Sequence, residues 1–295
     1  MKMRFIARII CIVLLMILLL LLVLTAYFIL IDIESKVPEE VEKNYTVQTK
    51  EFIGRNVFII KPNEERKINL KILYFHGGAY VAEMSKEHWD FIGKIAEETG
   101  ATIILPDYPL TPKYNYKDVF RMAIPLYKEI IEKVDTRNLI LMGDSAGGGI
   151  SLALLEKISE EGINQPKKTI LISPWLDVTL TNEKIEEIQK FDTDLNKETL
   201  KIAGISYAGE DGMDKYYVNP INGPLEKIKN VIVYTGTYDI LNPDTHILQE
   251  KARSVGNDII LKEYEEAKHI WIIKHNSDEE LTQKAYNELL KDLIN

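Results

Sequence analysis

The feature that most constrains the fold is a series of short apolar runs separated by longer amphipathic stretches. Runs such as Ala-Thr-Ile-Ile-Leu at residues 101–105 are apolar at consecutive positions, which is typical of parallel strands covered on both faces. Strands are predicted at residues 57–60, 72–75, 101–105, 139–142, 169–172, 231–234 and 259–264, and helices at residues 86–98, 116–134, 147–161, 244–255 and 278–293. This order predicts one α/β domain with a mostly parallel central sheet and helices on both faces.

Residues 177–226 interrupt that order. They are charged, contain short helical stretches and lie between two predicted strands. In this architecture such an insertion is either a lid over the carboxyl edge of the sheet or a surface insertion with no role in function. The domain is predicted to span residues 51–295, with a polar tether at residues 37–50 before it.

The amino-terminal part of the chain has a different composition. Residues 9–31 are all apolar except Thr25, and a helix of this length would measure about 35 Å, enough to cross a hydrocarbon core of about 30 Å. Basic residues precede the run, whereas acidic residues dominate after it. Residues 1–36 are therefore predicted to form a single-pass membrane anchor with its flanks, with a cytoplasmic amino terminus and an extracytoplasmic domain.

Two alternatives to an anchor remain. A cleaved signal peptide normally has an apolar region of about 7–15 residues that ends at a small-residue site, and Leu24-Thr25-Ala26 is a poor match to such a site. A buried core helix is rarely apolar all round for this length. The expectation is an intact anchor that contacts the lipid bilayer.

Charge and cysteine content exclude several other classes. The chain has 36 basic and 45 acidic residues, a net charge of −9, which argues against a nucleic-acid partner because such a partner needs a clustered basic face. A single cysteine, Cys11, excludes an intrachain disulfide framework and a cysteine-based zinc cluster. We expect no metal and no cofactor, and composition does not predict the oligomeric state.

The strongest local motif is Gly143-Asp144-Ser145-Ala146-Gly147. A predicted strand precedes it and a predicted helix follows it, which is the setting of a nucleophilic serine on a sharp strand-to-helix turn. The flanking glycines would let the strand and helix approach closely, and the helix amino terminus adds positive potential where an oxyanion forms. The alternatives are a glycine-rich structural turn or a phosphate-binding loop, although no lysine follows as a phosphate loop requires.

A second motif, His76-Gly77-Gly78-Ala79-Tyr80, follows the predicted strand at residues 72–75. Adjacent glycines after a strand can direct backbone N–H groups into a shared cavity, where they and the N–H of the residue after the serine would bind an oxyanion. A simple turn between strand and helix is the alternative. His76 is expected to order this loop, and Tyr80 to line the substrate pocket.

These residues resemble the hormone-sensitive lipase-like carboxylesterase family of α/β-hydrolases, with its His-Gly-Gly loop and Gly-Asp-Ser-Ala-Gly-Gly elbow. The segments at residues 107–112, 173–177 and 236–241 resemble further family motifs in family order, so the resemblance covers residues 55–290. The chain departs from the family pattern at Ala79, where a third glycine is usual, and at Ile270, where glycine usually follows the base. Pro109 and Lys113 replace the usual arginine and glutamate.

The resemblance and the chain order in this fold imply a triad of Ser145, Asp239 and His269. His269 lies just after the last predicted strand, whereas His246 falls in a predicted helix and His275 lies closer to the final helix. Asp239 follows the strand at residues 231–234. Its rival, Asp244, is expected to cap the adjacent helix.

The predicted reaction is hydrolysis of short or medium acyl esters through an acyl-enzyme. The N–H groups of Gly77, Gly78 and Ala146 would hold the oxyanion, with Ala79 as an alternative to Gly78. The same residues would serve a deacetylase or acyltransferase of cell-envelope glycans or lipids. A catalytically silent binding protein is the third alternative, because fold alone does not establish activity.

Overall fold

The computed structural model of the 295-residue chain describes residues 10–23, 32–63, 69–274 and 279–295. The chain divides into two units, Met1–Ile33 and Glu34–Asn295. In the first unit, residues 10–23 form a helix with exposed apolar side chains all along it, from 48% exposure at Val13 to 67% at Leu15. In the described part of the chain, no helix is both long and apolar enough to cross a membrane. The predicted span at residues 9–31 extends at both ends beyond the described residues.

The second unit is built on an eight-stranded sheet of order β1-β2-β4-β3-β5-β6-β7-β8. Strands β3 to β8 are all parallel, whereas β2 pairs antiparallel with β4 and β1 pairs antiparallel with β2. The strands are β1 (Tyr45–Phe52), β2 (Arg55–Pro62), β3 (Lys71–Phe75), β4 (Thr102–Pro106), β5 (Leu139–Asp144), β6 (Lys168–Ile172), β7 (Val231–Gly236) and β8 (Ile260–Tyr264). The parallel strands therefore share one carboxyl edge.

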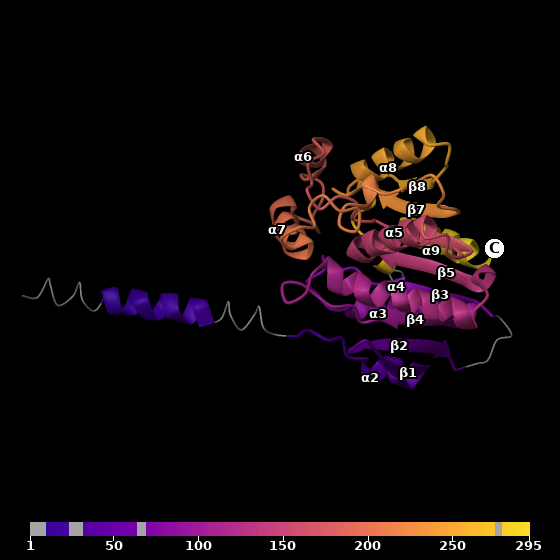
Figure 1. Cartoon of the computed structure of the whole chain (residues 1–295), viewed down its shortest axis with the longest axis horizontal. Coiled ribbons are helices and arrows are strands. Elements are labelled where there is room, and N and C mark those ends of the chain that lie inside the picture. The colour runs from indigo at the N-terminus through magenta and orange to yellow at the C-terminus, as the bar shows by residue number, and fades with distance from the viewer. Residues whose placement is uncertain (1–9, 24–31, 64–68, 275–278) are drawn as a thin grey trace, which may run out of the picture. The chain divides into compact units, whose positions relative to one another are not determined.

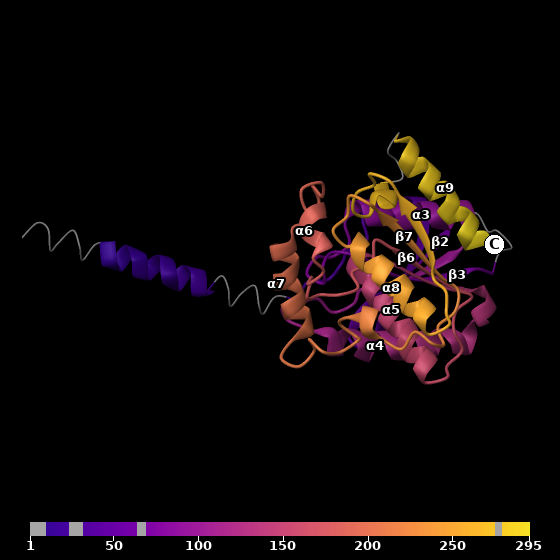
Figure 2. The same ribbon diagram turned by 90° about the horizontal axis from the view of Figure 1, so that it is seen from above.

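Helices cover both faces of the sheet, as the two views in Figures 1 and 2 show. The helices α3 (Lys86–Thr99) and α9 (Glu280–Ile294) pack together on one face, and the helices α4 (Tyr116–Lys133), α5 (Ser145–Glu160) and α8 (Asn242–Ser254) cover the other. Each strand predicted from an apolar run is present, and so is each predicted helix. The predicted mostly parallel α/β architecture is confirmed.

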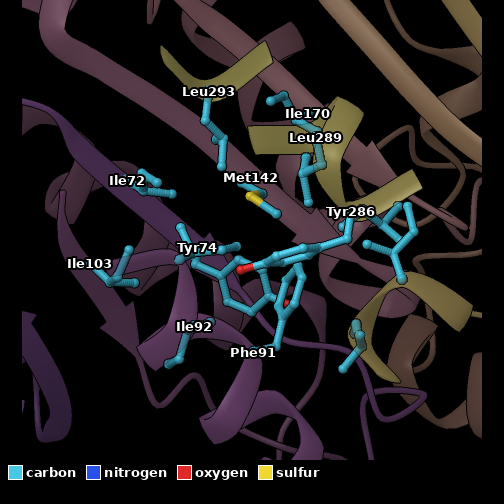
Figure 3. Close-up of a cluster of buried hydrophobic side chains, with 14 of the residues drawn as sticks. Ile72, Tyr74, Phe91, Ile92, Ile103, Met142, Ile170, Tyr286, Leu289 and Leu293 are labelled. Atoms are coloured by element: carbon cyan, nitrogen blue, oxygen red, sulfur yellow. The ribbon is translucent and has the colours of Figure 1, made fainter. Parts of the chain in front are cut away.

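A layer of large apolar side chains joins the sheet to α3 and α9 (Figure 3). Ile72 and Met142 come from central strands, Phe91 comes from α3, and Leu289 comes from α9; each is at most 1% exposed. All six residues of β5 are buried, because helices cover both of its faces. This double coverage explains why apolar runs without alternation mark the central strands.

The tether predicted at residues 37–50 is wrong for most of that segment. Residues Glu39–Asn44 form the short helix α2, and Tyr45–Phe52 form β1, which pairs along its whole length with β2. A two-residue turn joins these strands, with Ile53 at φ 52° and Gly54 at φ 73°, a conformation that suits a tight hairpin. Since β1 is a mostly exposed edge strand held by backbone hydrogen bonds, its sequence lacks the apolar signal of the inner strands.

The insertion at residues 177–226 contains the helices α6 (Lys184–Ile188) and α7 (Lys197–Ala208) and the 3₁₀ turn η2 (Pro220–Asn222). Both views show α6 and α7 together at one end of the domain. Side chains of the insertion contact the loops after β3, β4 and β7, all of which leave the carboxyl edge of the sheet. Of the two predicted alternatives, these contacts match a cap over that edge.

Candidate active site

The nucleophile elbow is a turn of one residue between β5 and α5. Asp144 ends the strand, and Ser145 begins the helix with φ 49°, in the left-handed region. The glycines on both sides are required by close packing: a Cβ on Gly143 would lie 2.3 Å from the carbonyl oxygen of Gly147, and one on Gly147 would lie 2.0 Å from that of Phe75. The sequence pattern thus places the serine on a strained turn at the carboxyl edge of the sheet.

The structure brings the side chains of Ser145, His269 and Asp239 together. Nε2 of His269 lies 3.0 Å from Oγ of Ser145, and Nδ1 of His269 lies 2.9 Å from Oδ2 of Asp239. All three residues are buried, with Asp239 fully enclosed and the other two 4% exposed. The carboxylate of Asp239 accepts a hydrogen bond from Nδ1–H of His269, so the neutral imidazole presents its Nε2 lone pair to the serine hydroxyl.

The electrostatic surroundings act on the basicity of His269. Burial disfavours the charged imidazolium, but the adjacent Asp239 carboxylate and, more weakly, Asp192 outweigh it and raise the pKa of His269 above its usual value. The imidazole is therefore a stronger proton acceptor than an isolated histidine. It can take a proton from a hydroxyl and remain stabilised as a cation.

The loops that carry His269 and Asp239 are held by groups from other segments. The backbone N–H of Ile270 donates to Oγ of Ser173 at 3.1 Å, and Ile270 adopts φ 46°, which explains why glycine is usual at this position. Asp192, in the cap, accepts the backbone N–H of Ile240 at 2.9 Å. The residue beside the acid is thus fixed by a cap carboxylate.

The oxyanion loop differs from prediction at Gly77. Its backbone N–H donates to Oδ1 of Asp144 at 2.9 Å, so the prediction that this group faces an oxyanion is wrong. Within the described residues, the N–H groups of Gly78, Ala79 and Ala146 have no acceptor. The N–H of Ala79, the predicted alternative to that of Gly78, is therefore available to an oxyanion in addition to that of Gly78, whereas the N–H of Gly77 is not. Ala79 adopts φ 54°, where the usual glycine would be unstrained.

Asp144 organises the back of the elbow. Oδ1 accepts the Tyr74 hydroxyl at 2.5 Å as well as the Gly77 N–H, and Oδ2 accepts Nε2 of His88 at 3.1 Å. Burial favours the neutral carboxyl, yet the hydrogen-bonded His88 and the hydrogen bond from Tyr74 hold the pKa of Asp144 below its usual value. The charged carboxylate ties the elbow to the oxyanion loop.

His88 and Tyr74 were not predicted to take part in the site. His88 lies in the first turn of α3, where its Nδ1 accepts the backbone N–H of Ser85 at 3.2 Å, so its Nε2–H can only donate to Asp144. A histidine in a helix start carries no local signal for this pairing. The sequence offers one clue to these partners: a carboxylate at Asp144, on the predicted sharp turn between strand and helix, needs hydrogen-bond donors.

His76 does not contact the reacting side chains. It is fully buried and stacked on Tyr108 at 4.5 Å between ring centroids, and the hydroxyl of Tyr108 donates to the His76 carbonyl. Burial and the nearby His88 lower the pKa of His76 to about 4, so it is neutral at physiological pH. These contacts fit the predicted role in ordering the loop.

The rival triad residues lie elsewhere. Oδ1 of Asp244 accepts the side-chain amide of Asn182 in the cap, and α8 begins before it with Leu241 as N-cap; the prediction that Asp244 caps this helix is wrong. His246 is partly exposed on α8 and pairs with Glu263, whereas His275 lies outside the described residues. In the described part of the chain, no group of three His, Cys, Asp or Glu side chains is arranged to hold a metal.

Tyr80, predicted to line the pocket, is 1% exposed. Its ring stacks on Tyr207 of α7 at 3.6 Å and on Trp175, after β6, at 5.3 Å between centroids. Its backbone also adopts a left-handed conformation, with φ 64°. The residue after the oxyanion loop therefore joins the sheet edge to the cap.

Comparisons with known proteins agree with this architecture. The family model described as the alpha/beta hydrolase fold matches residues 72–273. An esterase of Acinetobacter venetianus is 30% identical over 196 residues, 65% of this chain and 64% of that protein. An acetyl-hydrolase of Streptomyces hygroscopicus is 26% identical over 68% of this chain and 67% of that protein. The chain thus matches about two thirds of the length of these relatives.

Solved structures give the same result. A candidate esterase from Staphylococcus aureus superposes with a TM-score of 0.80 at 25% identity, covering 88% of this chain and 86% of that one. An esterase of the bacterial hormone-sensitive lipase family, 24% identical, shares the fold with a TM-score of 0.79 over 88% of this chain and 87% of the other. The chain belongs to the α/β-hydrolase fold family, and its resemblance to the hormone-sensitive lipase-like carboxylesterases is confirmed.

Proposed function

We propose that the protein is a serine hydrolase that cleaves carboxylic esters through an acyl-enzyme. The observation that carries this proposal is the continuous hydrogen-bonded series from Asp239 through His269 to Ser145. It lies at the carboxyl edge of the sheet, beside three backbone N–H groups without acceptors in the described residues. The esterase and acetyl-hydrolase relatives support the same reaction class.

In the first step, Nε2 of His269 accepts the proton of the Ser145 hydroxyl as Oγ attacks the ester carbonyl carbon. Asp239 keeps the imidazole in the tautomer that can accept this proton and stabilises the imidazolium. His269 then protonates the leaving alcohol, and the carbon–oxygen ester bond breaks. Water attacks the acyl-enzyme with His269 again as base, which releases the acid and restores Ser145.

The N–H groups of Gly78, Ala79 and Ala146 are the proposed oxyanion donors. Ala146 lies in the first turn of α5, where the amino terminus of a helix stabilises negative charge. Removal of one such donor typically costs about 3–4 kcal/mol of barrier. Asp144 does not contact the oxyanion itself. It accepts a hydrogen bond from the N–H of Gly77 and so orients the peptide groups that follow.

The acyl group is proposed to be short or medium in length. Tyr80 and Tyr207 stack closely beside the oxyanion loop and are each 1% exposed, so they occupy space that a long chain would need. The acetyl-hydrolase among the relatives supports this assignment. An acetyl ester of a cell-envelope glycan or lipid is the corresponding alternative substrate.

We further propose that residues 9–31 anchor the enzyme in a bilayer, with the amino terminus in the cytoplasm and the catalytic domain outside it. The support is the length of the apolar run, the basic residues before it and the acidic residues after it. Exposed apolar side chains along residues 10–23 are consistent with lipid contact.

Hydrolysis of p-nitrophenyl esters from acetate to decanoate by the full chain in mild detergent tests the activity, with Ser145→Ala as the matched control. We expect a release of p-nitrophenol that declines with acyl length and is absent in the variant. Equal rates in both proteins would refute the mechanism. For the anchor, resistance of membrane-bound protein to carbonate extraction is expected, and a mature amino terminus near Tyr27 would refute it.

A further inference from the structure

The attachment of the amino-terminal segment to the domain lies at the catalytic edge. The backbone N–H of Ser35 donates to Oδ1 of Asp107 at 3.0 Å, and Arg55 pairs with Oδ2 of Asp107 at 3.2 Å and with Glu34 at 3.7 Å. Ser35, Arg55 and Asp107 are all at most 5% exposed. Asp107 directly follows Pro106, the carboxyl end of β4, so this fixed point shares the sheet edge with Ser145.

The chain between the apolar run and this fixed point is short. Three residues, 32–34, separate residue 31 from Ser35, and the four steps from residue 31 to Ser35 reach at most about 14 Å at about 3.5 Å per step. The headgroup layer on one side of a bilayer takes up about 5–7 Å of that reach. If an anchor ends at residue 31, this reach and the hydrogen bond from Ser35 to Asp107 set an upper limit on the distance between Asp107, at the carboxyl edge of the sheet, and the hydrocarbon core.

The cap presents apolar side chains at this same edge. Ile202 is 71% exposed and Ile205 is 52% exposed, three residues apart on the outer face of α7. Tyr207, on the inner face, stacks on Tyr80. The neighbouring residue Ser206 is hydrogen-bonded to Thr111, four residues after Asp107, so α7 lies on the segment that begins at the attachment point.

An amphipathic helix normally turns its isoleucines inward. Here α7 buries one apolar face against the domain and leaves two isoleucines outside, and Ile202 is the most exposed large apolar side chain among the described residues. Ile202 and Ile205, one helical turn apart, form a small exposed apolar patch, and contiguous apolar patches are surfaces that proteins use to meet a partner or a membrane. The short connection to residue 31 selects the bilayer as that partner.

We propose that the catalytic edge rests against the bilayer, with Ile202 and Ile205 in contact with lipid, and that the enzyme cleaves short or medium acyl esters of lipids held in the bilayer. The inference rests on the proposed esterase activity and on the proposed anchor. A lipid ester would then reach Ser145 by rising from the bilayer under the cap rather than by diffusing through water. The rest of the lipid stays in the bilayer, and only the short or medium acyl group enters the site.

The first test measures lipid contact directly. In a Cys11→Ser background, the full chain carries an environment-sensitive dye on Ile205→Cys, or on Val255→Cys as a matched control. Val255 is 41% exposed and follows α8 at the opposite edge of the sheet. In vesicles of phosphatidylcholine and phosphatidylglycerol, we expect a lipid-borne quencher to quench the dye at residue 205 and not at residue 255.

Equal quenching at the two positions would overturn the inference. A blue-shifted dye at residue 205 that the lipid quencher does not reach would also overturn it, because a second copy of the chain would then cover the isoleucines.

The second test separates lipid esters from soluble ones. The double variant Ile202→Asp/Ile205→Asp should hydrolyse p-nitrophenyl acetate within about twofold of the parent, but dioctanoylglycerol in the same vesicles about tenfold more slowly, because contact with lipid is lost. Val255→Asp should leave both rates unchanged. An undiminished rate of the double variant on dioctanoylglycerol would overturn the inference.

Two controls show which premise has failed. No hydrolysis of p-nitrophenyl acetate by the parent chain would refute the proposed activity, and release of the chain from vesicles by carbonate would refute the anchor. Either result overturns this inference together with its premise. If both premises hold, only the dye and the vesicle rates decide the outcome.

Discussion

Two buried aspartate–histidine pairs flank the nucleophile elbow. One of them contacts the serine hydroxyl, and the other contacts a backbone N–H of the oxyanion loop. Asp239 and His269 lie in front of Ser145, and Nε2 of the histidine faces the serine hydroxyl. Asp144 and His88 lie behind it, and the same carboxylate holds the backbone N–H of Gly77. Pairing of a carboxylate with an imidazole therefore does not by itself mark a catalytic base.

The free nitrogen of each imidazole makes the difference. In the front pair, the Nε2 lone pair is directed to a hydroxyl on a strained turn. In the rear pair, Nδ1 of His88 is occupied by Ser85, the N-cap of α3, so no lone pair is left to accept a proton. The front pair can move a proton, whereas the rear pair is suited to fixing the oxyanion loop.

The largest difference in kcat is expected between alanine substitutions of Ser145, in the front pair's site, and of Ser85, beside His88 in the rear pair. Ser145→Ala should lower kcat for p-nitrophenyl acetate by about 10⁴–10⁶-fold, because the nucleophile is removed. Ser85→Ala should cost only about 1 kcal/mol of unfolding free energy through loss of the cap, with a small change in rate. Parallel rate and urea-unfolding measurements check both variants, and comparable rate losses would contradict the division of roles.

The next effect concerns Asp239. Asp239→Asn should lower kcat by about 10³–10⁴-fold, since the imidazole loses its orienting acceptor. In the parent, the raised pKa of His269 keeps the imidazole protonated to a higher pH, so the rate should fall as the pH drops through a value above about 6.5. Loss of the carboxylate charge should move this acid limb to lower pH.

Asp244→Asn provides the matched control for that variant, because Asp244 is buried but bonded to the cap. Its rate should stay near that of the parent. A larger loss in Asp244→Asn than in Asp239→Asn, measured as a pH–rate profile, would show that the acid is wrongly assigned.

Substitution of Asp144, the carboxylate of the rear pair, should lower both the stability and kcat. Asp144→Asn leaves an amide N–H₂ facing the Nε2–H of His88, so one hydrogen bond is replaced by a clash of donors. Unfolding free energy should fall by about 3 kcal/mol, and kcat should fall about 10²-fold as the oxyanion donors shift. A variant with full stability and activity would show that the Gly77 contact does not position the loop.

A smaller effect is expected for His88→Gln, which can retain a weaker donor to Asp144. A loss of about 1–2 kcal/mol in unfolding free energy and about a tenfold loss in kcat should leave the acid limb of the pH–rate profile in place, because His88 is not the base. The substitution His246→Gln, at a partly exposed position on α8, should change the unfolding free energy by less than about 0.5 kcal/mol. Movement of the acid limb in His88→Gln would contradict the comparison.

The smallest effect concerns the oxyanion loop itself. Ala79 adopts φ 54°, and relief of this conformation in Ala79→Gly should raise the unfolding free energy by up to about 1 kcal/mol. The N–H donor is kept, so kcat should change little. Thermal unfolding measures the gain, and a clear loss of stability would show that the Cβ of Ala79 makes a contact that outweighs the strain.

The central strands were predictable from sequence because burial on both faces leaves an unbroken apolar run. The candidate triad was predictable for a different reason: each residue follows a strand whose end the apolar pattern marks, and only a few histidines follow Ser145. β1 could not be predicted in this way, since an exposed edge strand is held by its backbone. The hydrogen bond between His88 and Asp144 spans 56 residues of chain, so no local spacing reveals it.

The sequence could not predict which backbone N–H groups of the oxyanion loop are free to bind an oxyanion. Whether the N–H of Gly77 or that of Ala79 is available depends on the orientation of single peptide planes. That orientation is set by a carboxylate from another strand, Asp144. Glycine content indicates that such a loop can form, but not which of its amides is already bonded.

The contacts of Asp192 limit which caps could be exchanged between this protein and related hydrolases. This cap carboxylate accepts three backbone N–H groups, two within its own turn and one from Ile240 beside Asp239. A chimera that received the cap of another hydrolase without an acceptor at this place would leave the acid loop with an unsatisfied amide. The cap is thus not an independent module, and successful grafts should be those that bring their own carboxylate.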